Sequence, residues 1–176
     1  MSRISLAELN ALPGPEYLFR LGELYEYSPW VVEESCGRRP FASLKAMQAT
    51  LESIIYGATQ AEQLSLLRAH PDLAAKIEQV ASLTEFSRGE QTRAGFAELP
   101  AAQLKELRFK LEAYRERFAH PFILCVSEHN ASETLPILGA RLEASIDSER
   151  IACLAQVARI GWHRLSKLVT TEPLQS

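Results

Sequence analysis

The chain has 176 residues, of which 47% are hydrophobic and 23% are charged. These values are typical of one globular domain of ordinary size and exclude general disorder. The formal net charge of -3 argues against a nucleic-acid partner, which usually requires a concentrated basic face, although it leaves room for a local basic pocket.

No apolar segment is long enough to span a bilayer, and the first eight residues do not resemble a signal peptide. The three cysteines, Cys36, Cys125 and Cys153, are far apart and form no Cys-x-x-Cys pair. This pattern argues against a disulfide framework or a zinc site. We therefore expect a cytoplasmic protein with buried thiols and no membrane partner.

Helical spacing of apolar residues dominates the sequence, and alternating strand-like runs are scarce. In the first part of the chain we expect short helices up to the His70-Pro71 pair, because capping residues and prolines stand where helices begin. The expected starts are after Ser5, at Pro15, at Trp30, after Ser43 and after Thr59, where Glu62 completes a capping-box pattern.

The rest of the chain continues the helical pattern after an irregular middle. We predict an all-α, single-domain bundle of about eight helices over residues 1–176. The later elements, in chain order, are a loop with a short helical turn at 72–86, a helix at about 87–96, a long amphipathic helix opened by Pro100, a buried apolar run at 122–126, and helices at about 131–145 and 149–169, the last capped by Ser148.

The four histidines, His70, His120, His129 and His163, form no compact metal motif, because none occurs as HxxH, HxH or HExxH. A metal site would have to be assembled from distant parts of the chain, and we expect none. The sequence also lacks a Gly-rich phosphate loop and a GxSxG nucleophile elbow.

His70 is the most unusual candidate for chemistry, because a helix is expected to end on it and Pro71 follows. Proline prevents regular helix pairing and fixes the chain direction. A histidine held in this way suits proton transfer, because its ordinary pKa lies near neutrality. The other interpretation, equally compatible with the residues alone, is a histidine that favours the negative end of the helix dipole.

The segment Ser87-Arg88-Gly89-Glu90-Gln91 has two interpretations as well. Ser87 and Glu90 match a capping box, and that structural interpretation is favoured when the segment is taken alone. The first N–H groups of a helix also bind anions, and the Gln91 amide both donates and accepts hydrogen bonds. Such a helix start suits a ligand rich in C=O and N–H groups, such as a ureide.

Two further candidates come from later in the chain. Arg164 lies among apolar neighbours, where its planar guanidinium is suited to hold an oxygen-rich ligand; the residues alone favour a partly exposed arginine with a buried stem. Core packing is the favoured interpretation of a run without a reactive side chain: Phe122, Ile123, Leu124, Cys125 and Val126. In the other interpretation, a ligand supplies hydrogen-bonding partners to its buried backbone N–H and C=O groups.

Several short motifs occur in a fixed order along nearly the whole chain. They are Arg39-Pro40-Phe41, His70-Pro71-Asp72-Leu73-Ala74, Leu83-Thr84, Ser87-x-x-Glu90-Gln91-x-x-Ala94-Gly95, Tyr114-x-x-Arg117-Phe118, Pro121-Phe122-Ile123-x-Cys125 and Arg164-Leu165. In this order and spacing the chain resembles the OHCU decarboxylases. OHCU, 2-oxo-4-hydroxy-4-carboxy-5-ureidoimidazoline, is an unstable intermediate between urate and (S)-allantoin.

The resemblance implies an all-α enzyme, usually a homodimer, that acts on a small-molecule ureide without a cofactor or metal. It implies that His70 is the catalytic acid/base, that Glu90 works beside it, and that the segment from Ser87 through Arg88 and Gly89 to Gln91 binds the ring or the ureido group. It also implies that Pro71 and the Phe122–Val126 backbone line the pocket and that Arg164 contacts a substrate oxygen. Phe96 and Val126-Ser127 depart mildly from the family pattern, which puts the pocket wall in doubt but no named catalytic group.

Two other classes of function stay open at this point. In a non-enzymatic helical interaction module, each of these residues would be a cap, a core residue or part of a solvated face. A metal-dependent hydrolase of a related ureide would need bound zinc or manganese.

Overall fold

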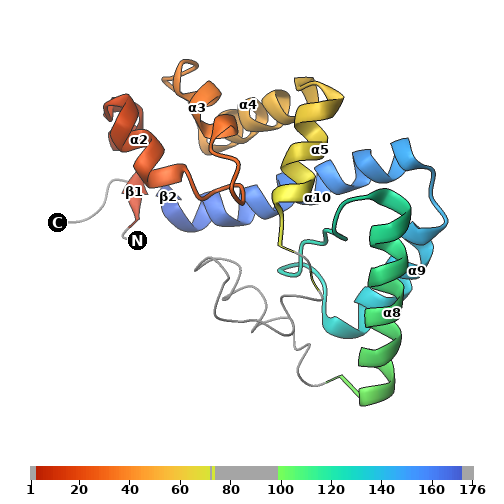
Figure 1. Cartoon of the computed structure of the whole chain (residues 1–176). Coiled ribbons are helices and arrows are strands. Elements are labelled where there is room, and N and C mark those ends of the chain that lie inside the picture. The colour runs from red at the N-terminus through yellow and green to blue at the C-terminus, as the bar shows by residue number, and fades with distance from the viewer. Residues whose placement is uncertain (1–2, 72, 74–98, 172–176) are drawn as a thin grey trace.

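The computed structural model describes residues 3–71, 73 and 99–171 (Figure 1). This part of the chain contains eight helices and one pair of two-residue strands, which confirms the predicted all-α fold class. The loop predicted at 72–86 and the helix predicted at 87–96 lie outside the described residues, apart from Leu73. The helices are α1 Leu6–Ala11, α2 Gly14–Leu21, α3 Trp30–Cys36, α4 Leu44–Gly57, α5 Gln60–Ala69, α8 Ala101–Phe118, α9 Ala131–Leu142 and α10 Ile146–Leu168; the strands are β1 Ile4–Ser5 and β2 Val169–Thr170.

Side-chain caps begin most of these helices. Ser5 and Thr59 each close a capping box with the glutamate three residues on, as the sequence predicts for Thr59. The prediction that Ser148 caps the last helix is wrong. Ser145 has extended backbone geometry, and its hydroxyl accepts a hydrogen bond from the Ser148 N–H at 3.2 Å, so α10 begins three residues earlier than expected.

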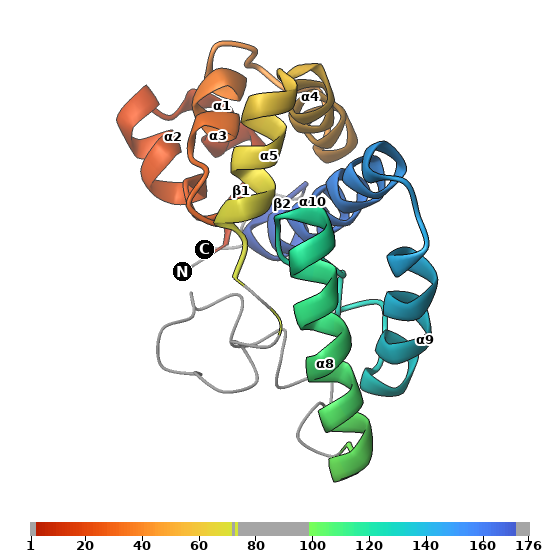
Figure 2. The same cartoon turned by 45° about the vertical axis from the view of Figure 1, so that its right-hand side comes forward.

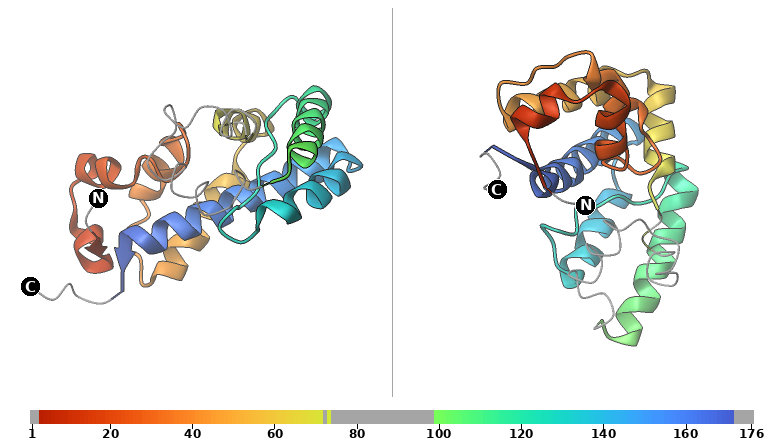
Figure 3. Two further views of the ribbon diagram at one scale, coloured as in Figure 1. Left: turned by 90° about the horizontal axis from the view of Figure 1, so that it is seen from below. Right: turned by 90° about the vertical axis from the view of Figure 1, so that its left-hand side faces the viewer.

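Helix α10 runs the length of the molecule, from α9 at one end to the paired strands at the other (Figures 1 and 3). It packs against α4 and α5, and with α1 to α3 these helices enclose the larger of two hydrophobic clusters. At Gly161 of α10 an added Cβ would lie 2.6 Å from the ring of buried Tyr25, which belongs to the segment between α2 and α3. The glycine therefore leaves room for this ring against α10.

A second hydrophobic cluster lies between α8 and α9, which pack beside each other (Figure 2). The extended run 122–126 passes between the two clusters. Its side chains alternate, as they do in any extended chain: Ile123 and Cys125 belong to the larger cluster, and Phe122 and Leu124 belong to the second. The prediction that this run is buried is confirmed, since its first four residues are at most 8% exposed.

The strands β1 and β2 pair in parallel, with Ile4 opposite Val169 and Ser5 opposite Thr170. This pairing brings the two ends of the described chain together (Figure 1). Among the helices that the structure describes, none combines the length and apolar character needed to cross a membrane.

Candidate active site

His70 occupies the C-cap position of α5, where the backbone turns from helical to extended at φ -70° and ψ 136°. The residue is 5% exposed, and its Nδ1 lies 2.9 Å from the carbonyl oxygen of Leu66. Because a carbonyl oxygen only accepts, Nδ1 must carry the hydrogen of this bond. The neutral ring is therefore the Nδ1–H tautomer, in which Nε2 is the atom that takes up a proton.

The backbone of the 122–126 run is held by side chains from two helices. The Ile123 carbonyl oxygen accepts a hydrogen bond from Nη1 of Arg141 at 2.6 Å, and the Cys125 N–H donates to Oε1 of Gln156 at 2.9 Å. The run therefore has a fixed position as well as a buried one, and two of its polar backbone groups find partners within the protein.

Arg164 is 1% exposed, so the partly exposed arginine favoured by the sequence alone is wrong. Its Nη2 donates to Oε1 of Glu26 at 2.8 Å, and its Nη1 donates to the Leu24 carbonyl oxygen at 3.2 Å. Glu26 is itself buried. An arginine stays charged when it is buried, and its planar fork allows one guanidinium to bind both groups.

Packing relates these parts of the predicted site to one another. Leu66 and Leu67 before His70, Ile123 in the extended run and Leu165 beside Arg164 all belong to the larger hydrophobic cluster. A hydrogen bond of 3.1 Å from Nε of Arg68 to the Ala119 carbonyl oxygen also joins the end of α5 to the end of α8. The residues Ser87, Arg88, Gly89, Glu90 and Gln91 lie outside the described part of the chain.

Comparison with known proteins identifies the family to which this chain belongs. The sequence profile described as OHCU decarboxylase matches residues 10–166. The chain belongs to the OHCU decarboxylase family.

Individual members of the OHCU decarboxylase family match over nearly the full chain. The 2-oxo-4-hydroxy-4-carboxy-5-ureidoimidazoline decarboxylase of Haloferax volcanii is 32% identical, over 98% of this chain and 100% of its own. The uric acid degradation bifunctional protein PucL of Bacillus subtilis is 31% identical, over 94% of this chain and 33% of its own. A solved (S)-allantoin synthase superposes with a TM-score of 0.72 at 28% identity, over 94% of this chain and 54% of the other.

The OHCU decarboxylase family member also contains a buried polar network on α8, α9 and α10. The sequence patterns did not predict this network. Glu149 is completely buried and accepts hydrogen bonds from the Tyr114 hydroxyl and from Arg141, whose Nε lies 2.8 Å from Oε1. Burial raises the pKa of Tyr114 well above its usual range, and burial raises the pKa of the neighbouring Cys153 thiol to about 11. Tyr114 and Cys153 are therefore neutral near pH 7 and take part in this network as hydrogen-bonding groups.

One signal in the sequence does indicate buried ion pairs on α10. The buried face of α10 is apolar through its middle but includes Glu149 near its start and Arg164 near its end. A charged residue in register with a buried apolar face requires a partner. The partners, Arg141 and Glu26, lie on other elements, and the spacing of residues within α10 does not identify them.

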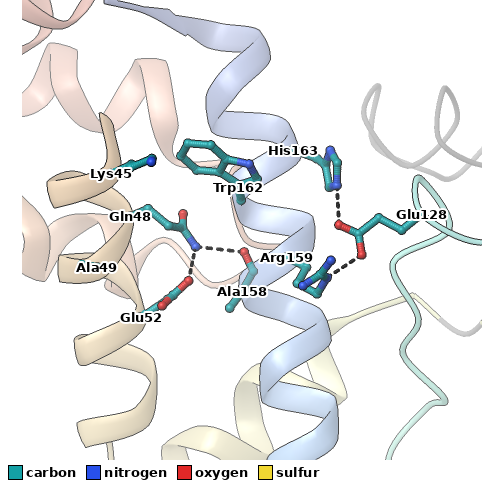
Figure 4. A pocket seen from close by; sticks show the side chains of 9 residues that line it. All are labelled: Lys45, Gln48, Ala49, Glu52, Glu128, Ala158, Arg159, Trp162 and His163. Atoms are coloured by element: carbon teal, nitrogen blue, oxygen red, sulfur yellow. Dashed lines mark hydrogen bonds and ion pairs between the residues drawn. The ribbon is translucent and has the colours of Figure 1, made fainter. Parts of the chain in front are cut away.

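A pocket of about 440 Å³ lies between α4 and α10 (Figure 4). Glu128 lies on one side of this pocket. Its carboxylate accepts a hydrogen bond from the Arg159 guanidinium, and its Oε1 lies 2.7 Å from Nε2 of His163. The pocket is lined by Lys45, Gln48, Ala49, Glu52, Glu128, Ala158, Arg159, Trp162 and His163. None of the predicted catalytic or substrate-binding residues is among them.

Proposed function

We propose that this protein decarboxylates OHCU to (S)-allantoin in the breakdown of urate. Its similarity to OHCU decarboxylases over nearly the full chain supports this reaction. The structural observation that carries the proposal is the buried His70, whose Nδ1 is fixed on the Leu66 carbonyl oxygen. That contact orients Nε2 as the atom that exchanges a proton with a substrate.

The proposed chemistry needs only a positioned substrate and a proton. When the bond between the ring carbon and its carboxylate breaks, the electron pair moves into the ring and is accepted by the adjacent C=N bond. Carbon dioxide leaves, and an enol-like intermediate with a new C=C bond remains. Protonation of the ureido-bearing carbon and return of the enol to a carbonyl then give allantoin, with the enol O–H proton passing to the ring nitrogen that gained the C=N electron pair. Delivery of the carbon-bound proton to one face sets the S configuration.

In this proposal His70 delivers the proton, and Glu90 either orients His70 and raises its pKa or contacts the substrate directly. Pro71 and the backbone of the 122–126 run line the pocket, and Arg164 contacts a substrate oxygen. The segment from Ser87 through Arg88 and Gly89 to Gln91 binds the ring or the ureido group. The buried positions of His70 and Arg164 support these roles, because a water-poor site strengthens each polar contact with the substrate.

Further parts of the proposal concern the state of the protein. We propose that residues 1–176 form one OHCU decarboxylase-like domain, that it works as a cytoplasmic homodimer, and that it needs neither cofactor nor metal. The electron sink within the substrate supports cofactor independence, because no external group is needed to accept the electron pair. The net charge of -3 supports a small-molecule partner over nucleic acid.

The decisive experiment generates OHCU in place from urate with two upstream enzymes and follows the product by circular dichroism. With this protein present, we expect rapid appearance of a single allantoin enantiomer. A rate and a racemic product equal to those of the spontaneous reaction would leave a helical interaction module as the better description. Activity that a chelator abolishes would instead favour a metal-dependent enzyme.

A further inference from the structure

Three side chains that can bind a metal ion come together beside the pocket between α4 and α10. They are the thiol of Cys125, the carboxylate of Glu128 and the imidazole of His163, and their ligand atoms all lie within 4.8 Å of one another. Two of them, Glu128 and His163, line the pocket. Cys125 is buried, so the cluster combines one buried donor with two donors that line the pocket.

The backbone fixes the relative positions of these donors. The Cys125 N–H is held by Gln156, and the Glu128 N–H donates to the Cys125 carbonyl oxygen at 2.9 Å, which closes a tight turn. His163 lies on α10, two helical turns after Gln156. The same helix therefore anchors the turn and supplies the third donor.

This donor set is typical of zinc. Zn²⁺ binds sulfur, nitrogen and carboxylate oxygen, and sites with three protein ligands keep a fourth position open. Bond lengths of about 2.0 Å to nitrogen and oxygen and about 2.3 Å to sulfur place tetrahedral ligands roughly 3.3–3.6 Å apart. The present Nε2–Oε1 separation is 2.7 Å, so this pair must open slightly while the thiol approaches. We expect rotations of the three side chains to bring their ligand atoms to these distances.

Arg159 is the competitor for this site, because it is paired with Glu128. Its side chain is 58% exposed, and an exposed ion pair contributes little to stability. Arg159 can therefore move into solvent when a divalent cation takes its place. The carboxylate keeps a positive partner throughout.

We propose that Cys125, Glu128 and His163 bind one Zn²⁺ ion, with the open coordination position directed into the pocket. Binding breaks the S–H bond of Cys125 and forms a Zn–S bond, and the proton passes to the solvent. Nε2 of His163 gives its lone pair to zinc while the ring hydrogen resides on Nδ1, and the Cys125 thiol releases its proton on binding. The ion is not a catalytic group of the proposed decarboxylation, although Cys125 belongs to the run whose backbone is proposed to line that substrate pocket.

The test measures zinc binding to full-length protein purified without a histidine tag, by calorimetry in two buffers with different heats of ionisation. We expect one ion per chain and the release of about one proton. Cys125→Ser and His163→Gln are each expected to weaken binding at least roughly 100-fold, because loss of an outer-shell partner alone costs 10–100-fold. Arg159→Gln is expected to tighten binding roughly two- to fivefold, since it removes the competitor.

Matched controls and a spectroscopic readout complete the design. Cys36→Ser and His129→Gln remove the same chemical groups elsewhere and should leave the affinity unchanged. Co²⁺ in place of zinc should give a thiolate-to-metal charge-transfer band, and the Cys125→Ser variant should lack this band. The far-ultraviolet circular dichroism spectrum of the Cys125→Ser variant shows whether it is folded. Absence of stoichiometric binding, or equal affinity in the Cys125, His163 and control variants, would overturn the proposal. Because no step depends on turnover, its failure is separate from failure of the decarboxylase proposal.

Discussion

Arg141 connects the buried carboxylate of Glu149 to the carbonyl oxygen of Ile123. One end of its guanidinium pairs with Glu149, and Nη1 lies 2.6 Å from the Ile123 oxygen. The same side chain lies over the ring of Phe122, with its Cζ 4.7 Å from the ring centroid. A single arginine of α9 thus fixes two successive residues of the run proposed to line the substrate pocket.

Replacement of this arginine tests how firmly the run is held. Arg141→Met leaves the Glu149 carboxylate buried without its cation and should lower the free energy of unfolding by about 3–5 kcal/mol. Urea denaturation measures the loss. The matched control is Arg117→Met, because Arg117 also donates to a carbonyl oxygen, that of Ala144, but from an exposed position; its cost should stay within about 1 kcal/mol. Equal losses in the two variants would show that the buried pair has no special role.

His70 is expected to be needed for turnover more than for folding. Asparagine can still donate a hydrogen bond to the Leu66 carbonyl oxygen but cannot transfer a proton, so His70→Asn should lower kcat at least roughly 100-fold. The measurement is allantoin formation from enzymatically generated OHCU, with His129→Asn as the matched control at a half-buried position. A near-normal rate in His70→Asn would return His70 to a structural role at the end of α5.

Arg164 has a structural partner as well as a proposed substrate contact, and two variants separate these roles. Arg164→Lys keeps the charge but loses the fork that reaches both Glu26 and Leu24, so it should cost about 2 kcal/mol of stability and raise KM. Glu26→Gln disrupts the same ion pair and should destabilise comparably without raising KM. If steady-state kinetics give the same KM for both variants, Arg164 acts only through the fold.

The buried His120 should make stability depend on pH. Burial lowers the pKa of this residue below its ordinary value of 6.5, against an opposing effect of nearby Glu149. Protons then bind the unfolded chain more readily than the native one, so the stabilising contribution is present above pH 6.5 and is lost as the pH falls below it. Urea unfolding at several pH values should show this loss, by at most about 1.4 kcal/mol per pH unit, and His120→Gln should remove that part of the slope. An identical slope in the variant would contradict the assignment.

Local sequence signals predicted most of the described helices because they act within a few residues. Thr59 and Glu62 cap α5 as expected, whereas α10 is capped by Ser145 and not by Ser148, because either serine satisfies the same local rule. Apolar spacing after Pro15 predicts a helix with Leu24 and Tyr25 on its buried side; α2 ends at Leu21, yet both residues are completely buried. Apolar spacing thus predicted their burial more reliably than their helical conformation.

The site was predictable only where chemistry and local geometry coincide. His70 stands out because proline follows it at a helix end, and the structure places it there with its ring buried. The pairing of Arg164 with Glu26 joins residues 138 positions apart, and the cluster of Cys125, Glu128 and His163 joins two elements. Contacts of this kind arise from tertiary packing and leave no spacing in the sequence to recognise.

The division of the apolar residues into two clusters has a consequence for how the molecule opens. Among the described residues, no side chain of α10 belongs to the cluster between α8 and α9, so α10 meets that hairpin chiefly through the Arg141, Glu149 and Tyr114 network. Native-state hydrogen exchange should therefore reveal a partial unfolding in which α8 and α9 detach while α10 keeps its amide protection against α4 and α5. Such an event would release the Ile123 carbonyl oxygen from Arg141. Partial unfolding of α8 and α9 would therefore transiently disrupt the run proposed to line the substrate pocket.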